Sequence, residues 1–158
     1  MAHGFMTGFL TLGTFALLST IIPLLIYLVN GIGFYKIGRI RGVQAPWLVF
    51  IPIFNLYTIG LIGDNLKYTN EKINHYFGGV NLALILPLGS LLFNVFTHGA
   101  ISDLGAMLLF CLQLMVYYLV YEFYDNEHKI LYTVLSVIPV VPAILMLYCT
   151  RDIKMNNY

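Results

Sequence analysis

The side chains that could bind a metal ion or catalyse a reaction are few and far apart. The sequence has four histidines, each in a different polar stretch: His3, His75, His98 and His128. Asp103 and Asp125 flank a predicted helix of about 21 residues, which places their carboxylates roughly 30 Å apart and excludes an aspartyl pair. Neither a GxSG nor an HExxH motif occurs. The sequence therefore predicts no metal ion, no cofactor and no catalytic residue.

Glu122 is the acidic side chain nearest to the interior of a long apolar run. It lies close to the end of a predicted helix, 104–124, so its carboxylate is expected to extend to the membrane interface. This position favours an interfacial anchor over a functional acid. One alternative keeps Glu122, together with His128, as the acid and base of a lipid-modifying enzyme in the membrane.

Neutral amides are the polar side chains expected deepest in the apolar runs, at Asn55, Asn94 and Gln113. Transporters coupled to ions or protons usually place a charged residue deep in the bilayer, and these runs contain none. The pattern therefore argues against coupled transport. It permits a passive pore, a site for a neutral or lipidic ligand, or simple contacts between helices.

Apolar segments make up most of the chain and must position these side chains. Of 158 residues, 59% are hydrophobic and 9% charged, and the mean hydropathy is +0.83. Soluble domains carry about 25% charged residues, so a soluble enzyme, a nucleic-acid-binding protein and a disordered regulator are excluded. The charges leave five charge-free runs, 1–35, 42–63, 73–102, 104–121 and 130–150. Since a bilayer-crossing helix needs about 20 residues, we predict one integral-membrane domain over residues 1–158, with no soluble domain.

The runs predict an all-α polytopic membrane protein with a bundle of four to five membrane helices. The helices are expected near 5–30, 79–96, 104–124 and 130–149, with the run 46–63 forming either a short span or a re-entrant hairpin. Two boundaries depend on local signals. Asn30-Gly31 is typical of a helix stop, and Ser102-Asp103 is typical of an N-cap.

Counting basic residues leaves both topologies open. If all five runs cross, five Lys and Arg residues lie on one side and three on the other; if the second run re-enters, the ratio is six to two. Short basic loops stay in the cytoplasm. Both topologies therefore place the loop 36–41 on the cytoplasmic side of the cell membrane and the N-terminus outside.

The segment after the basic loop has the most distinctive pattern in the chain. Pro46 suits the first turn of a helix, and Trp47 suits the headgroup boundary. The pattern G-x4-W-x3-I-P-x2-N-x-Y is carried by Gly42, Trp47, Ile51, Pro52, Asn55 and Tyr57. It resembles a segment of small uncharacterised multi-pass membrane proteins of bacteria, over residues 20–65. The resemblance implies a membrane protein and transfers no catalytic or ligand-binding residue.

Small size and the lack of catalytic groups favour a non-enzymatic membrane module, an accessory, immunity or regulatory subunit that contacts another membrane protein. The rival hypothesis is a small transporter or channel for a neutral or lipidic solute. The expected partners are the lipid bilayer and either a membrane protein or further copies of the chain, and no nucleic acid. The residues expected to contact a partner or ligand are Trp47, Pro52, Asn55, Tyr57, Asn94, Gln113 and Glu122.

Overall fold

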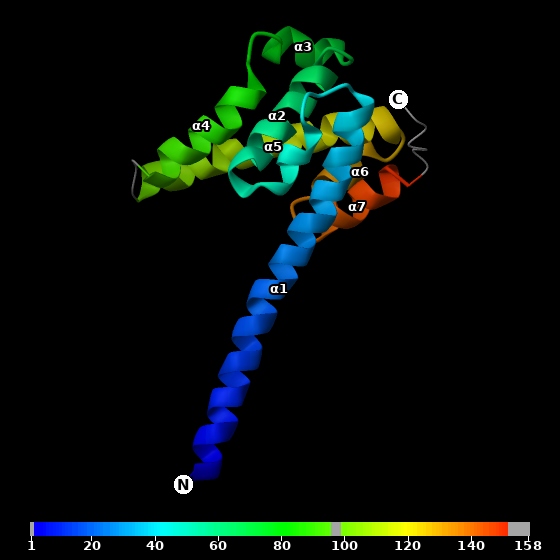
Figure 1. Cartoon of the computed structure of the whole chain (residues 1–158). Helices are drawn as coiled ribbons and strands as arrows, with labels where there is room; N and C mark the ends of the chain where they lie inside the picture. The colour runs from blue at the N-terminus through cyan, green and yellow to red at the C-terminus, as the bar shows by residue number, and fades with distance from the viewer. Residues whose placement is uncertain (1, 96–98, 152–158) are drawn as a thin grey trace.

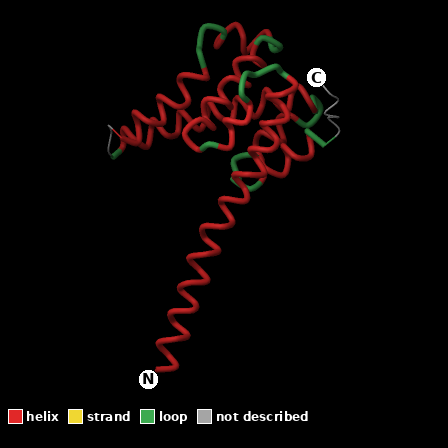
Figure 2. The backbone as a smooth tube through the Cα atoms, in the orientation of Figure 1, coloured by secondary structure: helices red, strands yellow, loops and turns green. Residues whose placement is uncertain are grey.

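The computed structural model describes the backbone of residues 2–95 and 99–151, and the side chains of residues 17–52, 54–93, 99 and 101–151. These residues form α-helices and one short 3-10 helix, and the described backbone contains no β-strand (Figure 2). The helices are α1 (Ala2–Ile40), η1 (Pro46–Phe50), α2 (Pro52–Lys67), α3 (Glu71–Phe77), α4 (Leu82–Val95), α5 (Ala100–Tyr124), α6 (Lys129–Leu135) and α7 (Val141–Cys149). The predicted all-helical fold is confirmed.

Helix α1 is much longer than predicted, because the chain does not use the stop signal at Asn30-Gly31. The Asn30 amide donates a hydrogen bond to the Tyr117 hydroxyl at 2.7 Å instead of ending the helix. Gly31 remains helical and leaves room for the Phe50 ring, whose Cε1 atom would lie 3.0 Å from an added Cβ. The helix continues to Ile40, and its N-terminal part extends far beyond the other helices (Figure 1).

The second apolar run folds as a hairpin made of η1 and α2. Tyr27 of α1 donates a hydrogen bond to the Val49 carbonyl at 2.9 Å, which fixes η1 against α1. Ile51 is extended, with φ −97° and ψ 117°, and reverses the chain. Pro52 then begins α2, where its missing N–H costs no helical hydrogen bond. Both ends of this hairpin lie at the same end of the molecule as the C-terminus of α1 (Figure 1).

The fifth run, predicted as one helix, is a second hairpin made of α6 and α7. The helix stops at Leu135, turns through residues 136–140 around Pro139, and restarts at Val141. Pro142 lies in the first turn of α7, the position that a proline tolerates best. Helix α7 returns along α1, where Gly33 leaves room for Met146.

Helix α2 lies at the centre of the molecule, packed against α1, α4 and α5. Two glycines permit the close approach. A Cβ added at Gly60 would lie 2.5 Å from the Ala83 Cα atom, and one added at Gly63 would lie 2.7 Å from the Val116 side chain. Small residues at such interfaces let helices pack closely where no hydrophobic effect drives them together.

Helices α4 and α5 form an antiparallel pair with reciprocal small and large residues. Gly89 of α4 faces Leu109 of α5, and Gly105 of α5 faces Phe93 of α4. Helix α5 begins at Ala100, with Gly99 as its N-cap residue, so the predicted cap at Ser102-Asp103 is wrong. The Ser102 hydroxyl donates a hydrogen bond to the Phe93 carbonyl at 2.9 Å instead, closing the turn between the two helices.

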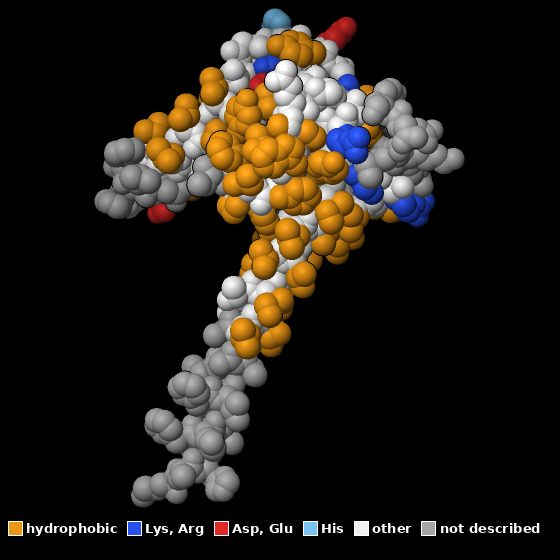
Figure 3. All heavy atoms as spheres, in the orientation of Figure 1, with side chains coloured by type: hydrophobic (Ala, Val, Ile, Leu, Met, Phe, Trp, Pro, Cys, Tyr) orange, Lys and Arg blue, Asp and Glu red, His pale blue; other side chains and the backbone are white. Residues whose placement is uncertain are grey.

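Two described helices are long and apolar enough to cross a membrane, namely Leu17–Ile40 and Ile101–Tyr124. Helix α3 and the segment Leu82–Phe93 together form a third candidate, bent by 54°. Large apolar side chains are exposed on α1, α4, α5, α6 and α7. Figure 3 shows hydrophobic side chains gathered over the described part of α1 and the middle of the helical body. These features support the predicted membrane insertion. The predicted count of four to five membrane helices is not confirmed.

Candidate functional site

Nearly all charged side chains of the described residues lie at one end of the molecule, here called the polar end. It consists of the C-terminal ends of α1, α2, α5 and α7, together with α3 and the turn 125–128 (Figure 1). The Lys and Arg residues of the described chain all belong to it: Lys36, Arg39, Arg41, Lys67, Lys72, Lys129 and Arg151. Asp103, at the beginning of α5, is the described charged residue at the opposite end.

Asp64 connects α2 to the beginning of α4. Its Oδ1 atom accepts a hydrogen bond from the Leu82 N–H at 3.1 Å, and its Oδ2 atom accepts one from the Ala83 N–H at 3.0 Å. These N–H groups open α4 and have no carbonyl partner within that helix. The positive end of the helix dipole also stabilises the carboxylate. Asp64 therefore caps a helix that begins 18 residues later in the chain.

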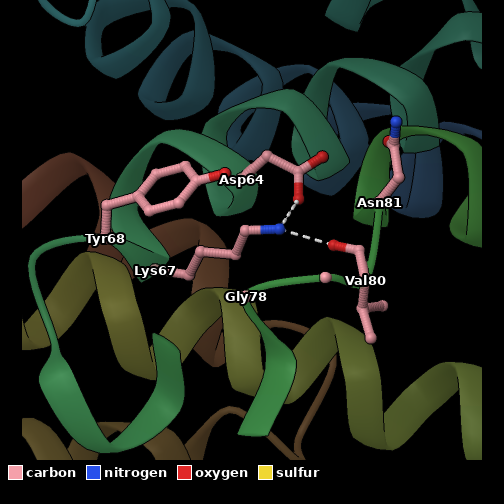
Figure 4. A pocket seen from close by; sticks show the side chains of 7 residues that line it. Asp64, Lys67, Tyr68, Gly78, Val80 and Asn81 are labelled. Atoms are coloured by element: carbon pink, nitrogen blue, oxygen red, sulfur yellow. Dashed lines mark hydrogen bonds and ion pairs between the residues drawn. The ribbon is translucent and has the colours of Figure 1, made fainter. Parts of the chain in front are cut away.

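Lys67 is held beneath this carboxylate, and its side chain is 3% exposed. Its Nζ atom donates to Asp64 Oδ1 at 2.8 Å and to the Val80 carbonyl, as Figure 4 shows. The same atom lies 5.5 Å from the centre of the Tyr68 ring. A buried ammonium is costly unless it is paired and hydrogen-bonded. Lys67 meets both conditions, and the contacts fix the loop before α4 against α2.

The Asp64–Lys67 pair lines a pocket of about 320 Å³ at the polar end (Figure 4). The other lining residues are Tyr68, Gly78, Gly79, Val80 and Asn81. The Asp64 carboxylate and the Lys67 ammonium form hydrogen bonds with each other and with backbone groups. The arrangement therefore supports a structural role, joining α2, α4 and the loop between them, rather than acid–base chemistry.

Glu122 is the centre of a second ionic cluster at the polar end. Its Oε1 atom accepts a hydrogen bond from Lys129 Nζ at 2.6 Å, and its Oε2 atom accepts one from the Asn70 amide. The bond to Glu122 raises the pKa of Lys129. The cluster joins the end of α5 to the loop before α3 and to the start of α6. The Glu122 carboxylate, expected from the sequence near the end of this helix, therefore has Lys129 and Asn70 as its partners.

His128 has a different partner from Glu122. Its Nδ1 atom lies 3.2 Å from Asp125 Oδ1. Desolvation raises the pKa of Asp125, but its hydrogen bonds with His128 outweigh that effect and hold the pKa below its usual value. The two side chains of the proposed lipid-modifying pair therefore belong to separate ion pairs.

A line of polar side chains crosses the helical body between α1, α5 and α6. Tyr117 of α5 accepts the hydrogen bond from Asn30, and Tyr121 shares a hydrogen bond with Ser136 at 2.9 Å. Two amide oxygens, Asn30 Oδ1 and Asn55 Oδ1, are buried and have no hydrogen-bond partner among the described residues. These oxygens are the acceptors that a neutral ligand or a water molecule would satisfy.

The structure does not bring the predicted contact residues into one site. Four belong to the first hairpin: Trp47, Pro52, Asn55 and Tyr57. Of these, Trp47 is 54% exposed on η1, Pro52 is the exposed start of α2, and the other two are partly buried. The first hairpin therefore presents the tryptophan outward and the asparagine inward.

The three remaining predicted residues lie elsewhere. Gln113 lines a pocket of about 230 Å³ between α2, α4 and α5, together with Leu56 and Ser90. Glu122 lies at the polar end, in the cluster described above. Asn94 belongs to α4, but its side chain lies outside the described residues.

No protein-family model matches the chain, and no curated protein or solved structure matches it either. The resemblance of the segment 42–57 to bacterial membrane proteins therefore stays a prediction. Within the described ranges, no group of three His, Cys, Asp or Glu side chains is arranged to hold a metal ion.

Three residues of the polar end were missed as candidate residues by the sequence analysis: Arg41, Asp64 and Lys67. The pair Asp64 and Lys67 has the i, i+3 spacing of a helical ion pair, but this spacing is usually found on exposed surfaces. Nothing local to Asp64 indicates that it caps α4. That contact depends on the close approach of α2 and α4 at Gly60.

Proposed function

We propose that this chain is a non-enzymatic membrane module that acts by binding another membrane protein along the extended part of α1. The observation that carries the proposal is the exposure of this helix. Every side chain from residue 17 to residue 25 is exposed, and most of them are large and apolar. No other described element lies beside this segment (Figure 1).

The length of α1 supports a protein partner in addition to lipid. Its residues from Ala2 to Tyr35 carry no charge and rise about 51 Å along the helix axis. A helix tilted by 40°, the upper end of the usual range, places only about 39 Å of its length in a 30 Å hydrocarbon layer. About 12 Å of apolar helix, or roughly eight residues, then extends beyond the hydrocarbon. The contacts with η1 and α7 cover such a length only at the C-terminal end of the helix.

Substitutions on α1 test this proposal. The triple variant Leu17→Ala, Leu18→Ala, Ile21→Ala removes large exposed side chains. It does not weaken the helix, because alanine has the highest helix propensity. In native lipid discs, we expect wild type to be recovered with a stoichiometric second membrane protein, and the variant with at least about tenfold less of it, since a few large side chains carry most interface energy. Mass measurement of the intact particles gives both quantities.

The matched control is the pair Met107→Ala, Leu108→Ala, on the exposed face of α5. Its recovery of the second protein should equal that of wild type. Equal recovery by the α1 variant, or a wild-type particle that holds a single copy of the chain alone, would contradict the proposal. A particle of several identical copies would favour the rival hypothesis of a small channel, for which the unpartnered oxygens of Asn30 and Asn55 are the supporting observation.

We also propose that the chain crosses the membrane three times, through α1, α4 and α5, and that both hairpins enter from the polar end and return to it. This topology places all the described Lys and Arg residues on one side, which by the positive-inside rule is the cytoplasm. Neither topology considered from the sequence alone reaches that bias. The N-terminus then lies outside, and the loop 36–41 lies in the cytoplasm.

Labelling with a membrane-impermeant maleimide tests the topology. Single cysteines at Asp103, Asn126 and Arg151, in a chain with Cys111 and Cys149 replaced by alanine, sample three loops. In intact cells we expect labelling at position 103 only; positions 126 and 151 should react only after the cells are opened. Five crossings would instead expose position 126 and protect 103, and four crossings would expose position 151.

A further inference from the structure

Arg41 presents a buried edge of its guanidinium with nothing to bind. Its Nε and Nη2 atoms are shielded from solvent and have no hydrogen-bond partner in the part of the chain that the structure describes. These two nitrogens form the side of the fork that binds carboxylate or phosphate through two parallel hydrogen bonds. The guanidinium stays charged at every physiological pH, so it cannot relieve its burial by losing a proton.

The end of α1 fixes the position of Arg41. The Gly42 N–H donates to the Arg39 carbonyl at 3.2 Å, and the Val43 N–H donates to the Gly38 carbonyl at 2.9 Å. These bonds make the Schellman motif, in which Gly42 takes the left-handed conformation with φ 65°. Arg41 is the last residue before this glycine, so its backbone is fixed by the turn.

The Phe123 side chain, at the end of α5, contacts the guanidinium. The central carbon of the guanidinium lies 3.7 Å from the centre of the Phe123 ring, a cation–π contact. The Tyr124 ring meets the Phe123 ring edge-on, with their centroids 5.0 Å apart. The Tyr124 hydroxyl is also buried and, within the described residues, has no partner. Among the described residues, the guanidinium edge of Arg41 and the phenol of Tyr124 are thus two hydrogen-bond donors without an acceptor, and both lie next to Phe123.

Two carboxylates at the C-terminal end of α5, Glu122 and the following Asp125, are already engaged. Glu122 binds Lys129 and Asn70, and Asp125 binds His128. The polar end also carries Lys36 and Arg39 beside Arg41, which adds positive potential there. Among the described residues, the donors of Arg41 and Tyr124 therefore have no acceptor, and an anion is the group that would satisfy them.

We infer that Arg41, Tyr124 and Phe123 form a binding site for a phosphate group at the polar end. Arg41 binds two phosphate oxygens through its Nε and Nη2 edge, the Tyr124 hydroxyl donates to a phosphate oxygen, and Phe123 supports the guanidinium plane. The Arg41 side chain as a whole is partly exposed, although its Nε and Nη2 edge is shielded. The phosphate comes either from an anionic lipid headgroup or from free phosphate. The inference does not depend on the function of α1 proposed above.

Binding to purified protein in a neutral, phosphate-free detergent tests the site. The probes are a short-chain phosphatidylglycerol and inorganic phosphate, each titrated while native mass spectrometry counts the bound molecules. Wild type should bind one phosphatidylglycerol tightly. Arg41→Gln should bind it at least about tenfold more weakly, and Arg41→Lys should also weaken binding because an ammonium lacks the planar fork. Tyr124→Phe should have a smaller effect of the same sign.

Arg39→Gln is the matched control, since it removes the same charge from the exposed side of the same turn; its binding should stay within about twofold of wild type. Binding of phosphatidylglycerol alone assigns the site to a lipid headgroup, whereas equal competition by inorganic phosphate assigns it to free phosphate. Equal affinity of Arg41→Gln and Arg39→Gln would overturn the site.

Thermal unfolding gives a second readout that a merely structural role of Arg41 would not produce. Without any phosphate, Arg41→Gln should unfold at the same temperature as wild type or higher, because the substitution removes an unpaired buried charge. With saturating phosphatidylglycerol, the midpoint of wild type should rise, since a ligand that binds only the folded state stabilises it, and that of Arg41→Gln should not. A variant that unfolds earlier than wild type in both conditions, with the same rise on adding lipid, would contradict the inference.

Discussion

Gly60→Ala is expected to lower the thermal midpoint of the purified protein by roughly 5–10 °C, corresponding to about 3 kcal/mol. The added methyl group would lie 2.5 Å from the Ala83 Cα atom and 2.6 Å from the Ala83 nitrogen. Both belong to the backbone of α4 and cannot move aside as a flexible side chain can. Helices α2 and α4 must therefore separate, which also weakens the hydrogen bonds from Asp64 to the start of α4.

Circular dichroism of the protein in detergent micelles measures this effect during heating. Gly79→Ala is the matched control, because an added Cβ at Gly79 meets nothing within 4 Å and the residue has no left-handed φ. The control should unfold within about 1–2 °C of wild type. If the two alanine variants unfold at the same temperature, α2 and α4 are not packed as described.

Asp64→Ala should destabilise the protein by about 3–5 kcal/mol, because it leaves the buried Lys67 ammonium without its counter-charge. The same substitution removes both acceptors from the first N–H groups of α4. Unfolding in a graded denaturing detergent, followed by tryptophan fluorescence of Trp47, measures the loss.

A double substitution separates the ion pair from the helix cap. Asp64→Ala combined with Lys67→Met replaces the charged pair with side chains that need no partner, and should recover at least half of the lost stability. The remaining loss measures the cap on α4. Glu71→Gln, an exposed charge in the first turn of α3, is the control and should cost less than about 1 kcal/mol. An Asp64→Ala variant as stable as this control would show that Lys67 is not buried against it.

Composition and charge spacing predict the helical, membrane-inserted character of the chain because each of these properties is local. An apolar run of about 20 residues has few alternatives to forming a helix in a membrane, and the polar stretches between such runs must form the turns. The turn 125–128 and the end of α5 at Tyr124 are thus found where the sequence places them.

The boundaries that differ from prediction depend on partners far away in the sequence. Asn30 continues a helix because Tyr117, from α5, accepts its amide hydrogen bond. Gly31 continues it because Phe50 uses the space that the glycine leaves. Pro139 and Pro142 are visible in the sequence, but only the packing of α7 against α1 decides that the chain reverses there.

At the polar end, too, some candidate residues can be found from local sequence signals, whereas others depend on contacts with distant residues. Glu122 stands out from the sequence because it is an acid at the edge of an apolar run. Asp64 does not stand out, because its role depends on the N–H groups of Leu82 and Ala83. Arg41 is one of three basic residues in the segment 36–41. Its buried nitrogens, which have no partner among the described residues, distinguish it from Arg39.

In the proposed three-crossing topology, both hairpins begin and end on the same side of the bilayer, and this determines which side chains must cross the bilayer when the protein is made. Neither hairpin needs to move a charged side chain across the hydrocarbon, since their basic residues all lie at the polar end. Among the described residues, Asp103 in the first turn of α5 is the charge that has to pass. Helices α4 and α5, packed through Gly89 and Gly105, can enter as one pair and share that cost. In this proposed topology, the hairpins insert from the cytoplasmic side, between helices that already span the bilayer.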